Sequence, residues 1–189
     1  MIGDLHCHTR FSDGSIGIDD LIFHAKRAGL DFVGVTDHDT MAGIKRAELL
    51  GKRYGIGIVG GVEISARDFS NGRRVHLLCY LPKVPDRLEG LLKRTLEGRN
   101  KALRESMQKV MRLFPVTEEH IMRYASGAAG LYSVHIMSAL CDLGYADGVY
   151  GTLYQKLLGP KTGICFVPHE YEDVWEVAKQ IKSAGGICV

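Results

Sequence analysis

The sequence predicts an α/β protein whose sheet is interrupted along the chain by a helical insertion. Over the first 80 residues, short apolar runs rich in β-branched residues alternate with amphipathic stretches, a rhythm typical of α/β folds. From about residue 84 to residue 160 the apolar residues recur with helical spacing instead. The alternation then returns. We therefore expect one domain formed by residues 1–84 and 161–189, and a helical subdomain formed by residues 85–160.

Composition indicates one core of ordinary size and excludes several specialised classes. Of the 189 residues 46% are hydrophobic, and 24 basic against 22 acidic residues leave a formal charge of only +2. This balance lacks the basic surplus of a dedicated nucleic-acid binder, so no stable nucleic-acid complex is expected. No apolar run approaches the roughly 20 residues that span a bilayer, and the first residues lack signal-peptide features. We expect a cytoplasmic protein without membrane association, and the five scattered cysteines are typical of reduced thiols.

The elements before residue 80 follow from the apolar pattern and from glycines that end helices. In order, we expect a strand near 2–8, a helix over 18–28 ended by Gly29, a strand over 32–36, a helix over 41–54 and a strand over 56–64. Asn71-Gly72 follows the last of these and precedes the apolar run Val75–Leu78. Because both central positions of a type I′ turn need positive φ, this pair predicts a tight antiparallel hairpin.

The elements after residue 84 follow from helical spacing and then from a return to short apolar runs. One apolar stripe predicts a long helix and consists of Leu96, Leu103, Met107, Val110 and Phe114. The remaining expected elements are helices over 117–124 and 133–143, a segment up to Leu158, a strand near 164–167, a helix over 172–184 and a strand that begins at Gly186.

The first chemical motif is a pair of histidines in the first expected strand. His6 and His8 point to the same face, because strand side chains alternate with period 2. An isolated pair of this kind is as often chance or solvated as metal-binding. Here Asp13 follows in a glycine-containing loop that can fold back toward the strand end, which favours a metal site.

The second motif is the charged trio Asp37-His38-Asp39 at the end of the next apolar strand, where α/β proteins place reactive groups. His38 is a candidate ligand. Asp37 is a candidate catalytic residue or an acceptor that fixes the tautomer of a ligating histidine. For Asp39 the alternative is a capping role at the start of the following helix.

The third motif is a single carboxylate, Glu63, at the end of a strand that is expected to be buried. Burying an unpaired carboxylate is costly, so a metal or a cationic partner is expected, and His76 across the hairpin is a further candidate. Counting outward from a two-residue turn pairs His76 with Arg67 and Glu63 with Tyr80. Glu63 and His76 would then lie four positions apart, roughly 13 Å. We therefore expect a bulge or an irregular stretch between them.

Together these motifs resemble the polymerase and histidinol phosphatase (PHP) family. The matching stretches are D-L-H-x-H-T-x-x-S-D-G at 4–14, T-D-H-D at 36–39 and G-V-E at 61–63, followed by His76. The insertion is similar to that of the small nucleotide-phosphatase branch, including Arg99-Asn100 and His135-Ile136. The resemblance implies a distorted (β/α)7 TIM-like barrel, incomplete at its C-terminus here. It also implies a metal-activated water that hydrolyses small phosphomonoesters such as nucleoside monophosphates or 3′,5′-bisphosphates.

The resemblance also implies ligands and substrate contacts. Two or three divalent ions, Zn, Mn or Fe, would be held in three sets: His6, His8 and Glu63; Glu63 and His76; Asp13 and His38. Arg99 and His135 would contact the substrate from an insertion that covers it, and His135 would also serve as an acid. Their alternatives are a solvated helix face for Arg99 and a surface position at a helix N-terminus for His135.

Three other functions stay open. A histidinol-phosphate phosphatase shares the metal chemistry, although that branch tends to have histidine where this chain has Asp13. A 3′ to 5′ exonuclease is disfavoured because no polymerase domain is present. Because the chain ends before the family's Ala-His-Pro and Asp-x-His ligand motifs, a non-catalytic fragment that binds a metal or a partner is the third. The expected ligand is a small phosphorylated substrate, in the first place a nucleotide, and the oligomeric state is not predicted.

Overall fold

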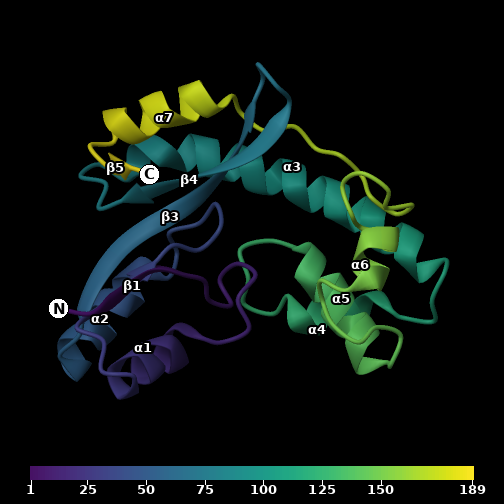
Figure 1. Cartoon of the computed structure of the whole chain (residues 1–189), viewed down its shortest axis with the longest axis horizontal. Coiled ribbons are helices and arrows are strands. Elements are labelled where there is room, and N and C mark those ends of the chain that lie inside the picture. The colour runs from purple at the N-terminus through teal and green to yellow at the C-terminus, as the bar shows by residue number, and fades with distance from the viewer. The chain divides into compact units, whose positions relative to one another are not determined.

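A computed structural model describes all residues, 1–189, and shows two compact units (Figure 1). The first comprises Met1–Leu96 and Tyr171–Val189, and the second comprises Glu97–Glu170. None of the helices is both long and apolar enough to cross a membrane.

The first unit contains one five-stranded mixed sheet in which the strands are ordered as in the chain. Its members are β1 (Gly3–Cys7), β2 (Phe32–Val35), β3 (Gly57–Asp68), β4 (Arg73–Tyr80) and β5 (Ile187–Cys188). Neighbouring strands are parallel from β1 to β3 and antiparallel from β3 to β5. The predicted α/β class is therefore confirmed. The sheet is open, with β1 and β5 at its edges, so the expected barrel is not observed.

The helices of this unit pack into two hydrophobic cores. They are α1 (Ile18–Arg27), α2 (Ile44–Tyr54), the first part of α3 (Asp86–Met111) and α7 (Val174–Ser183). One core joins α1 and α2 to β2, and the other joins α3 and α7 to β3 and β4. In the second core Val62 and Ile64 of β3 pack with Val177 and Ile181 of α7. Because strand side chains alternate, the odd-numbered residues of β3 point to the opposite face of the sheet.

The β3–β4 hairpin has a different register from the predicted one. Asp68 pairs with Arg73, so the connection has four residues and not two. The Asp68 carboxylate accepts hydrogen bonds from the Ser70 backbone N–H and from the Asn71 amide, and the Gly72 N–H donates to the Asp68 carbonyl. Asp68 thus closes a wider loop, in which Gly72 has a φ of 73°.

This register removes the need for the predicted bulge. Ser65 pairs with His76 and Glu63 pairs with Leu78 in an uninterrupted antiparallel ladder. Glu63 and His76 are therefore diagonal neighbours on one face, two positions apart, within reach of each other's side chains. Both the predicted pairing of Glu63 with Tyr80 and the irregular stretch were wrong.

The second unit is helical. It contains the rest of α3 with α4 (Glu118–Tyr124), α5 (Ser133–Asp142) and α6 (Thr152–Leu157), packed around one core. The strand predicted near 164–167 does not form. Instead Cys165 is buried in the helical core, and its N–H donates to the Leu157 carbonyl at the end of α6. Only Cys165 of this apolar run packs among the helices, whereas Ile164 is exposed, and the run has no neighbouring strand with which to pair.

Candidate metal centre

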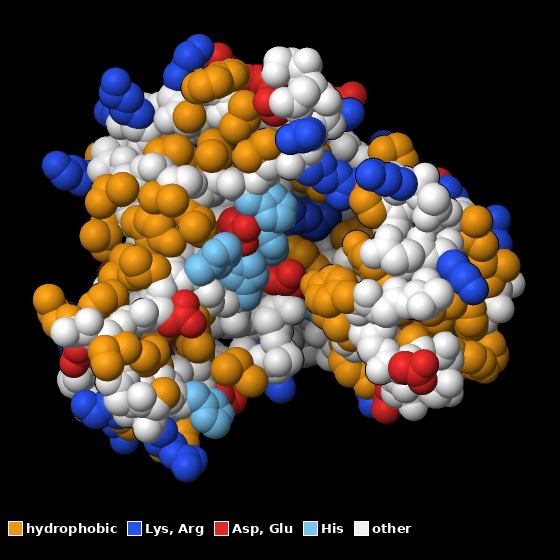
Figure 2. Space-filling view, in the orientation of Figure 1, with side chains coloured by type: hydrophobic (Ala, Val, Ile, Leu, Met, Phe, Trp, Pro, Cys, Tyr) orange, Lys and Arg blue, Asp and Glu red, His pale blue; other side chains and the backbone are white.

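The structure brings all six predicted ligands together in the first unit. They are His6 in β1, His8 just after it, Asp13 in the next loop, His38 after β2, Glu63 in β3 and His76 in β4. Figure 2 shows histidine side chains grouped with acidic ones on one face of the molecule. The ligand atoms form three overlapping groups, and within each group they lie within 4.8 Å of one another.

Glu63 occupies the centre of this arrangement. Its Oε2 atom lies 2.9 Å from His6 Nε2, 2.8 Å from His8 Nε2 and 3.5 Å from His38 Nε2. Its Oε1 atom lies 2.7 Å from His76 Nδ1. Glu63 is only 5% exposed. A buried carboxylate is thus surrounded by four imidazole rings, two from strands β1 and β4 and two from the chain that follows β1 and β2.

Asp13 contacts the His8 nitrogen atom that does not face Glu63, Nδ1. Its Oδ1 atom lies 2.8 Å from His8 Nδ1, and its Oδ2 atom lies 3.9 Å from His38 Nε2. The loop reaches this position by folding tightly over β1: the Gly14 N–H donates to the Thr9 carbonyl, and a Cβ at Gly14 would lie 2.5 Å from the His8 carbonyl oxygen. Only glycine allows this close approach.

Contacts within the cluster shift the pKa values of several of its members. Burial acts to raise the pKa of Glu63, but hydrogen bonds from His76 and His8 and the charge of His38 hold it well below its usual range. Burial acts to lower the pKa of His8, yet its hydrogen bonds to Asp13 and Glu63 raise it to about 9. Burial acts to raise the pKa of Asp13, but the hydrogen bond from His8 and the charges of His38 and His8 lower it. Positive charge is therefore favoured here, whether it comes from protons or from bound cations.

The donor set fits divalent transition-metal ions. It offers imidazole nitrogen and carboxylate oxygen atoms only, a mixture that suits Zn, Mn or Fe. His6 Nε2 and His8 Nε2 lie 3.2 Å apart while both approach the same Glu63 oxygen, so their lone pairs converge on one point. The groups also add a histidine to two of the predicted sets: His38 joins Glu63 and His76, and His8 joins Asp13 and His38. Sequence reasoning missed these shared ligands because strand spacing does not show which rings face one another across the sheet.

Asp37 supports the loop that carries Asp13. It is 2% exposed, and its carboxylate accepts hydrogen bonds from the Thr9 N–H at 2.7 Å, the Thr9 hydroxyl at 2.8 Å and the Ser12 hydroxyl at 2.6 Å. These contacts tie the end of β2 to the turn after β1. The carboxylate thus positions Thr9, which follows His8, and Ser12, which precedes Asp13.

Asp39 connects the end of β2 to β3. Its carboxylate accepts hydrogen bonds from the Ser65 N–H and hydroxyl, and its own N–H donates to the Glu63 carbonyl. It has a φ of 51°, in the left-handed region that aspartate tolerates better than most residues. Because α2 begins after Gly43, the capping role considered for Asp39 was wrong.

The predicted substrate contacts of the helical unit also lie together. The Arg99 guanidinium carbon lies 4.8 Å from the centre of the Tyr132 ring, and the Tyr132 and His135 rings meet edge to face at 5.6 Å. His135 Nδ1 accepts a hydrogen bond from the Tyr132 N–H, so Nε2 carries the proton in the neutral ring. Arg99 is 6% exposed and His135 is 5% exposed. Both are buried, so the solvated alternatives considered for them were wrong.

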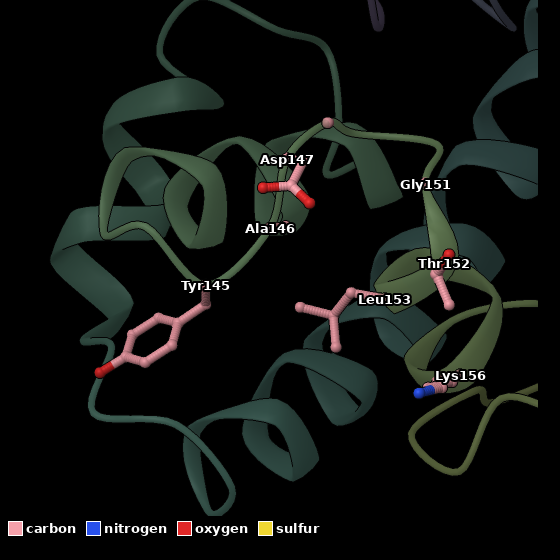
Figure 3. A pocket seen from close by; sticks show the side chains of 8 residues that line it. Tyr145, Ala146, Asp147, Gly151, Thr152, Leu153 and Lys156 are labelled. Atoms are coloured by element: carbon pink, nitrogen blue, oxygen red, sulfur yellow. The ribbon is translucent and has the colours of Figure 1, made fainter.

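A separate cavity of about 240 Å³ lies in the helical unit, between the loop after α5 and α6 (Figure 3). Its lining includes Tyr145, Asp147, Thr152 and Lys156, and none of the predicted site residues. Sequence reasoning gave no signal for it.

Comparison with known proteins identifies a family and several similar proteins. The profile of the PHP domain family matches residues 4–186. A phosphoribosyl 1,2-cyclic phosphate 1,2-diphosphodiesterase from Eggerthella lenta is 34% identical, over 100% of this chain and 72% of that protein. A 3′,5′-nucleoside bisphosphate phosphatase from Chromobacterium violaceum is 30% identical, over 98% of this chain and 65% of that protein.

The fold is shared with a solved structure as well. The crystal structure of a predicted metal-dependent phosphoesterase from Bifidobacterium adolescentis superposes with a TM-score of 0.89 at 25% identity. The match covers 98% of this chain and 65% of that one. The chain therefore spans between 65% and 72% of the length of these three proteins.

Proposed function

Because the chain belongs to the PHP domain family, we propose that it is a metal-dependent phosphoesterase that hydrolyses small phosphomonoesters. Nucleoside monophosphates and nucleoside 3′,5′-bisphosphates are the first candidates. The observation that carries the proposal is the buried Glu63 carboxylate, which four imidazole rings approach to within 2.7–3.5 Å. A carboxylate in this setting would serve as a ligand for divalent cations.

Each of the three groups of ligand atoms is a candidate position for one ion. The groups are His6, His8 and Glu63; His38, Glu63 and His76; and His8, Asp13 and His38. Divalent cations bound there would lower the pKa of a water molecule and offset charge on the phosphoryl oxygen atoms. Glu63 links the first two groups, so it would hold the relative position of their ions.

The remaining predicted residues would position and contact the substrate. Asp37 holds the loop on which Asp13 lies, and we assign it a positioning role alongside the catalytic role considered from the sequence. Arg99 and His135 are proposed to contact the phosphate group. A guanidinium offers fixed donors to phosphate, and the neutral His135 ring offers one proton at Nε2.

A cyclic phosphate diester is the second candidate substrate. The observation that favours it is the 34% identity to the E. lenta diphosphodiesterase over the whole of this chain. The same ligand set suits both reactions, because each needs an activated water and charge compensation at one phosphorus atom.

Metal content and phosphate release test the proposal together. The protein, purified without chelator, would be analysed by inductively coupled plasma mass spectrometry. It would then be assayed with Mn²⁺, Zn²⁺ or Fe²⁺ against a nucleoside monophosphate, a nucleoside 3′,5′-bisphosphate, a ribose cyclic phosphate, histidinol phosphate and a short RNA. We expect more than one equivalent of bound metal and metal-dependent release of phosphate from the first two substrates.

Controls separate this function from its alternatives. Glu63→Gln should lose both metal and activity. Asp19→Asn removes an exposed carboxylate that pairs with Arg46 at 2.7 Å, and it should keep both. Turnover of only the cyclic phosphate, histidinol phosphate or RNA would replace the proposed substrate class. Absence of bound metal would show that the chain is a non-catalytic member of the family.

A further inference from the structure

The edge strand β1 contains a β-bulge. Asp4 is the partner of Val33 in the parallel pairing with β2, but Cys7, three residues after Asp4, is the partner of Val35, only two residues after Val33. Two residues of β1 therefore stand opposite one residue of β2. Residues three apart in a regular strand point to opposite faces, yet the Asp4 and Cys7 side chains hydrogen-bond to each other. The bulge therefore reverses the alternation of side chains along β1.

This bulge puts the histidines of β1 on the face that carries the other ligands. Val35 of β2 belongs to the core formed with α1 and α2, and its partner Cys7 packs against the same core. In a ladder without the bulge His6 would be the partner of Val35, and its imidazole would point into that core. The extra residue moves Cys7 into this place, so His6 and His8 point to the face on which Glu63 lies.

Two contacts hold the bulge in place, and both involve the Leu5 carbonyl. The Leu5 carbonyl oxygen lies against Gly34 of β2, where the Cβ of any other residue would collide with it. The same oxygen accepts a hydrogen bond from the Tyr80 hydroxyl at 2.9 Å. Tyr80 lies at the end of β4, which is separated from β1 by two strands of the sheet. The bulge is thus tied to a distant strand by one side chain.

Tyr80 reaches β1 across the face that carries the ligands. It lies four residues after His76 on β4, so both side chains point to the same face of the strand. Its partner on β3 is Gly61, where a Cβ would lie 3.2 Å from the Tyr80 ring, and the absence of a side chain there leaves room for the ring. Burial and the charge of Glu63 raise the pKa of the Tyr80 hydroxyl, so it keeps its proton and donates.

We propose that Tyr80 is a positioning residue of the metal centre. Its hydroxyl fixes the bulge through the Leu5 carbonyl and thereby holds His6, the next residue, beside Glu63. His6 belongs only to the group of ligand atoms that it forms with His8 and Glu63, so Tyr80 controls the affinity of this one ion position. The inference rests on the proposed function in that it takes these groups to bind ions, and it does not depend on which phosphoester is hydrolysed.

The metal affinity of Tyr80→Phe tests the inference without turnover. The variant keeps the ring and removes only the hydroxyl, so the Leu5 carbonyl loses its donor. Chelator-treated protein would be titrated with Mn²⁺ by isothermal titration calorimetry, and with Co²⁺, whose visible absorption depends on the number and geometry of its ligands. One class of sites should weaken about tenfold, as is typical when a group that orients a metal ligand is lost, while the other sites keep the wild-type affinity.

Tyr124→Phe is the matched control. It removes a hydroxyl that is hydrogen-bonded to Asp142 in the helical unit, and it should keep the affinities of all metal sites. Gly34→Ala disturbs the bulge from β2, because the added Cβ would collide with the Leu5 carbonyl oxygen, and it should weaken the same class of sites as Tyr80→Phe. Unchanged Mn²⁺ binding in Tyr80→Phe, or equal weakening of every site, would overturn the inference.

Phosphate release by the same proteins separates this inference from the proposed function. In Tyr80→Phe the Mn²⁺ concentration for half-maximal activity should rise about tenfold, while kcat at saturating Mn²⁺ stays near the wild-type value. If the wild-type protein binds metal but hydrolyses no substrate, the hydrolase proposal fails, and selective weakening in Tyr80→Phe still supports the positioning role. If Tyr80→Phe binds Mn²⁺ and is activated by it like the wild-type protein, the positioning role fails and the hydrolase proposal stands. A wild-type protein that binds no metal contradicts both.

Discussion

Asp37 and Glu63 are both buried carboxylates at the same end of the sheet, but their partners differ. Asp37 accepts hydrogen bonds from one backbone N–H and two hydroxyl groups, which are permanent donors. Glu63 is approached by four imidazole rings, whose nitrogen atoms donate or accept according to protonation. The first environment satisfies a carboxylate under all ordinary conditions. The second satisfies it through ring N–H groups, added protons or bound cations, and therefore depends on pH and on metal.

This difference distinguishes support from function. A buried charge must be compensated, and fixed donors do so within the fold itself. Neutral imidazoles that are packed around a carboxylate can each donate one N–H, and their remaining lone pairs can bind a cation. Mutations at Asp37 should therefore mainly lower the free energy of unfolding, and mutations at Glu63 should mainly lower metal affinity.

The largest effect is expected for Glu63→Gln. The amide cannot bridge two cations, and its NH₂ group is directed at imidazole nitrogen atoms, so metal affinity and phosphate release should each fall by more than about 100-fold. Mass spectrometry of the metal content and the phosphate assay measure both. A variant that kept its full metal content would show that Glu63 is not a ligand.

A smaller effect, and on a different quantity, is expected for Asp37→Asn. The amide replaces an oxygen acceptor with a donor that faces the Thr9 N–H and the two hydroxyl groups, which should lower the free energy of unfolding of the metal-free protein by about 2 to 4 kcal/mol. Urea denaturation measures this. If stability is unchanged while activity is lost, Asp37 is catalytic and the contrast with Glu63 does not hold.

The pH dependence of stability sharpens the contrast further. Burial lowers the pKa of His8, but its bonds to Asp13 and Glu63 raise it from 6.5 to about 9. A folded-state pKa above the unfolded value stabilises the fold fully below pH 6.5, and this contribution is lost as the pH rises through about 9. Because His8 is partly exposed, screening reduces the loss to about 1 to 2 kcal/mol.

Bound metal should cancel this loss. A ligating imidazole must be neutral, so cations compete with protons and the metal-loaded protein should hold its stability or gain some over the same pH range. Urea denaturation at a series of pH values, with chelator and with Mn²⁺, gives the two curves. Parallel curves would mean that His8 does not bind metal. His24, which lies on α1 outside the cluster, provides a control position for substitution by glutamine.

The sequence predicted this cluster better than it predicted the hairpin beside it. The six candidate ligands lie in strands or in the chain that follows them, and the positions of these strands follow from apolar runs that the sequence shows directly. The hairpin register depends instead on Asp68, whose carboxylate organises a four-residue loop around Asn71 and Gly72. The Asn-Gly pair favours a two-residue turn, and local propensity alone could not show that a neighbouring side chain would override it.

The helical unit shows the same limit. The apolar run near residues 164–167 has the composition of a strand, yet Cys165 packs in a core formed by helices. Whether an apolar run becomes a strand depends on a partner edge, which is a property of the tertiary structure. The clustering of Arg99, Tyr132 and His135 was likewise beyond sequence reasoning, because it depends on how α3 and α5 pack.

The smallest effect is expected for Ser12→Ala, and it tests whether the support of Asp37 is additive. The Ser12 hydroxyl donates to Asp37 at 2.6 Å, while Thr9 supplies two further donors, so removal of one hydroxyl should cost about 1 kcal/mol. Metal content should stay near that of the wild-type protein, since Asp13 keeps its contact with His8. Urea denaturation measures the loss of stability, and metal analysis measures the metal content. A loss of metal larger than the loss of stability would mean that the loop acts on the ligands directly, and that the donors around Asp37 tune metal affinity as well as support the fold.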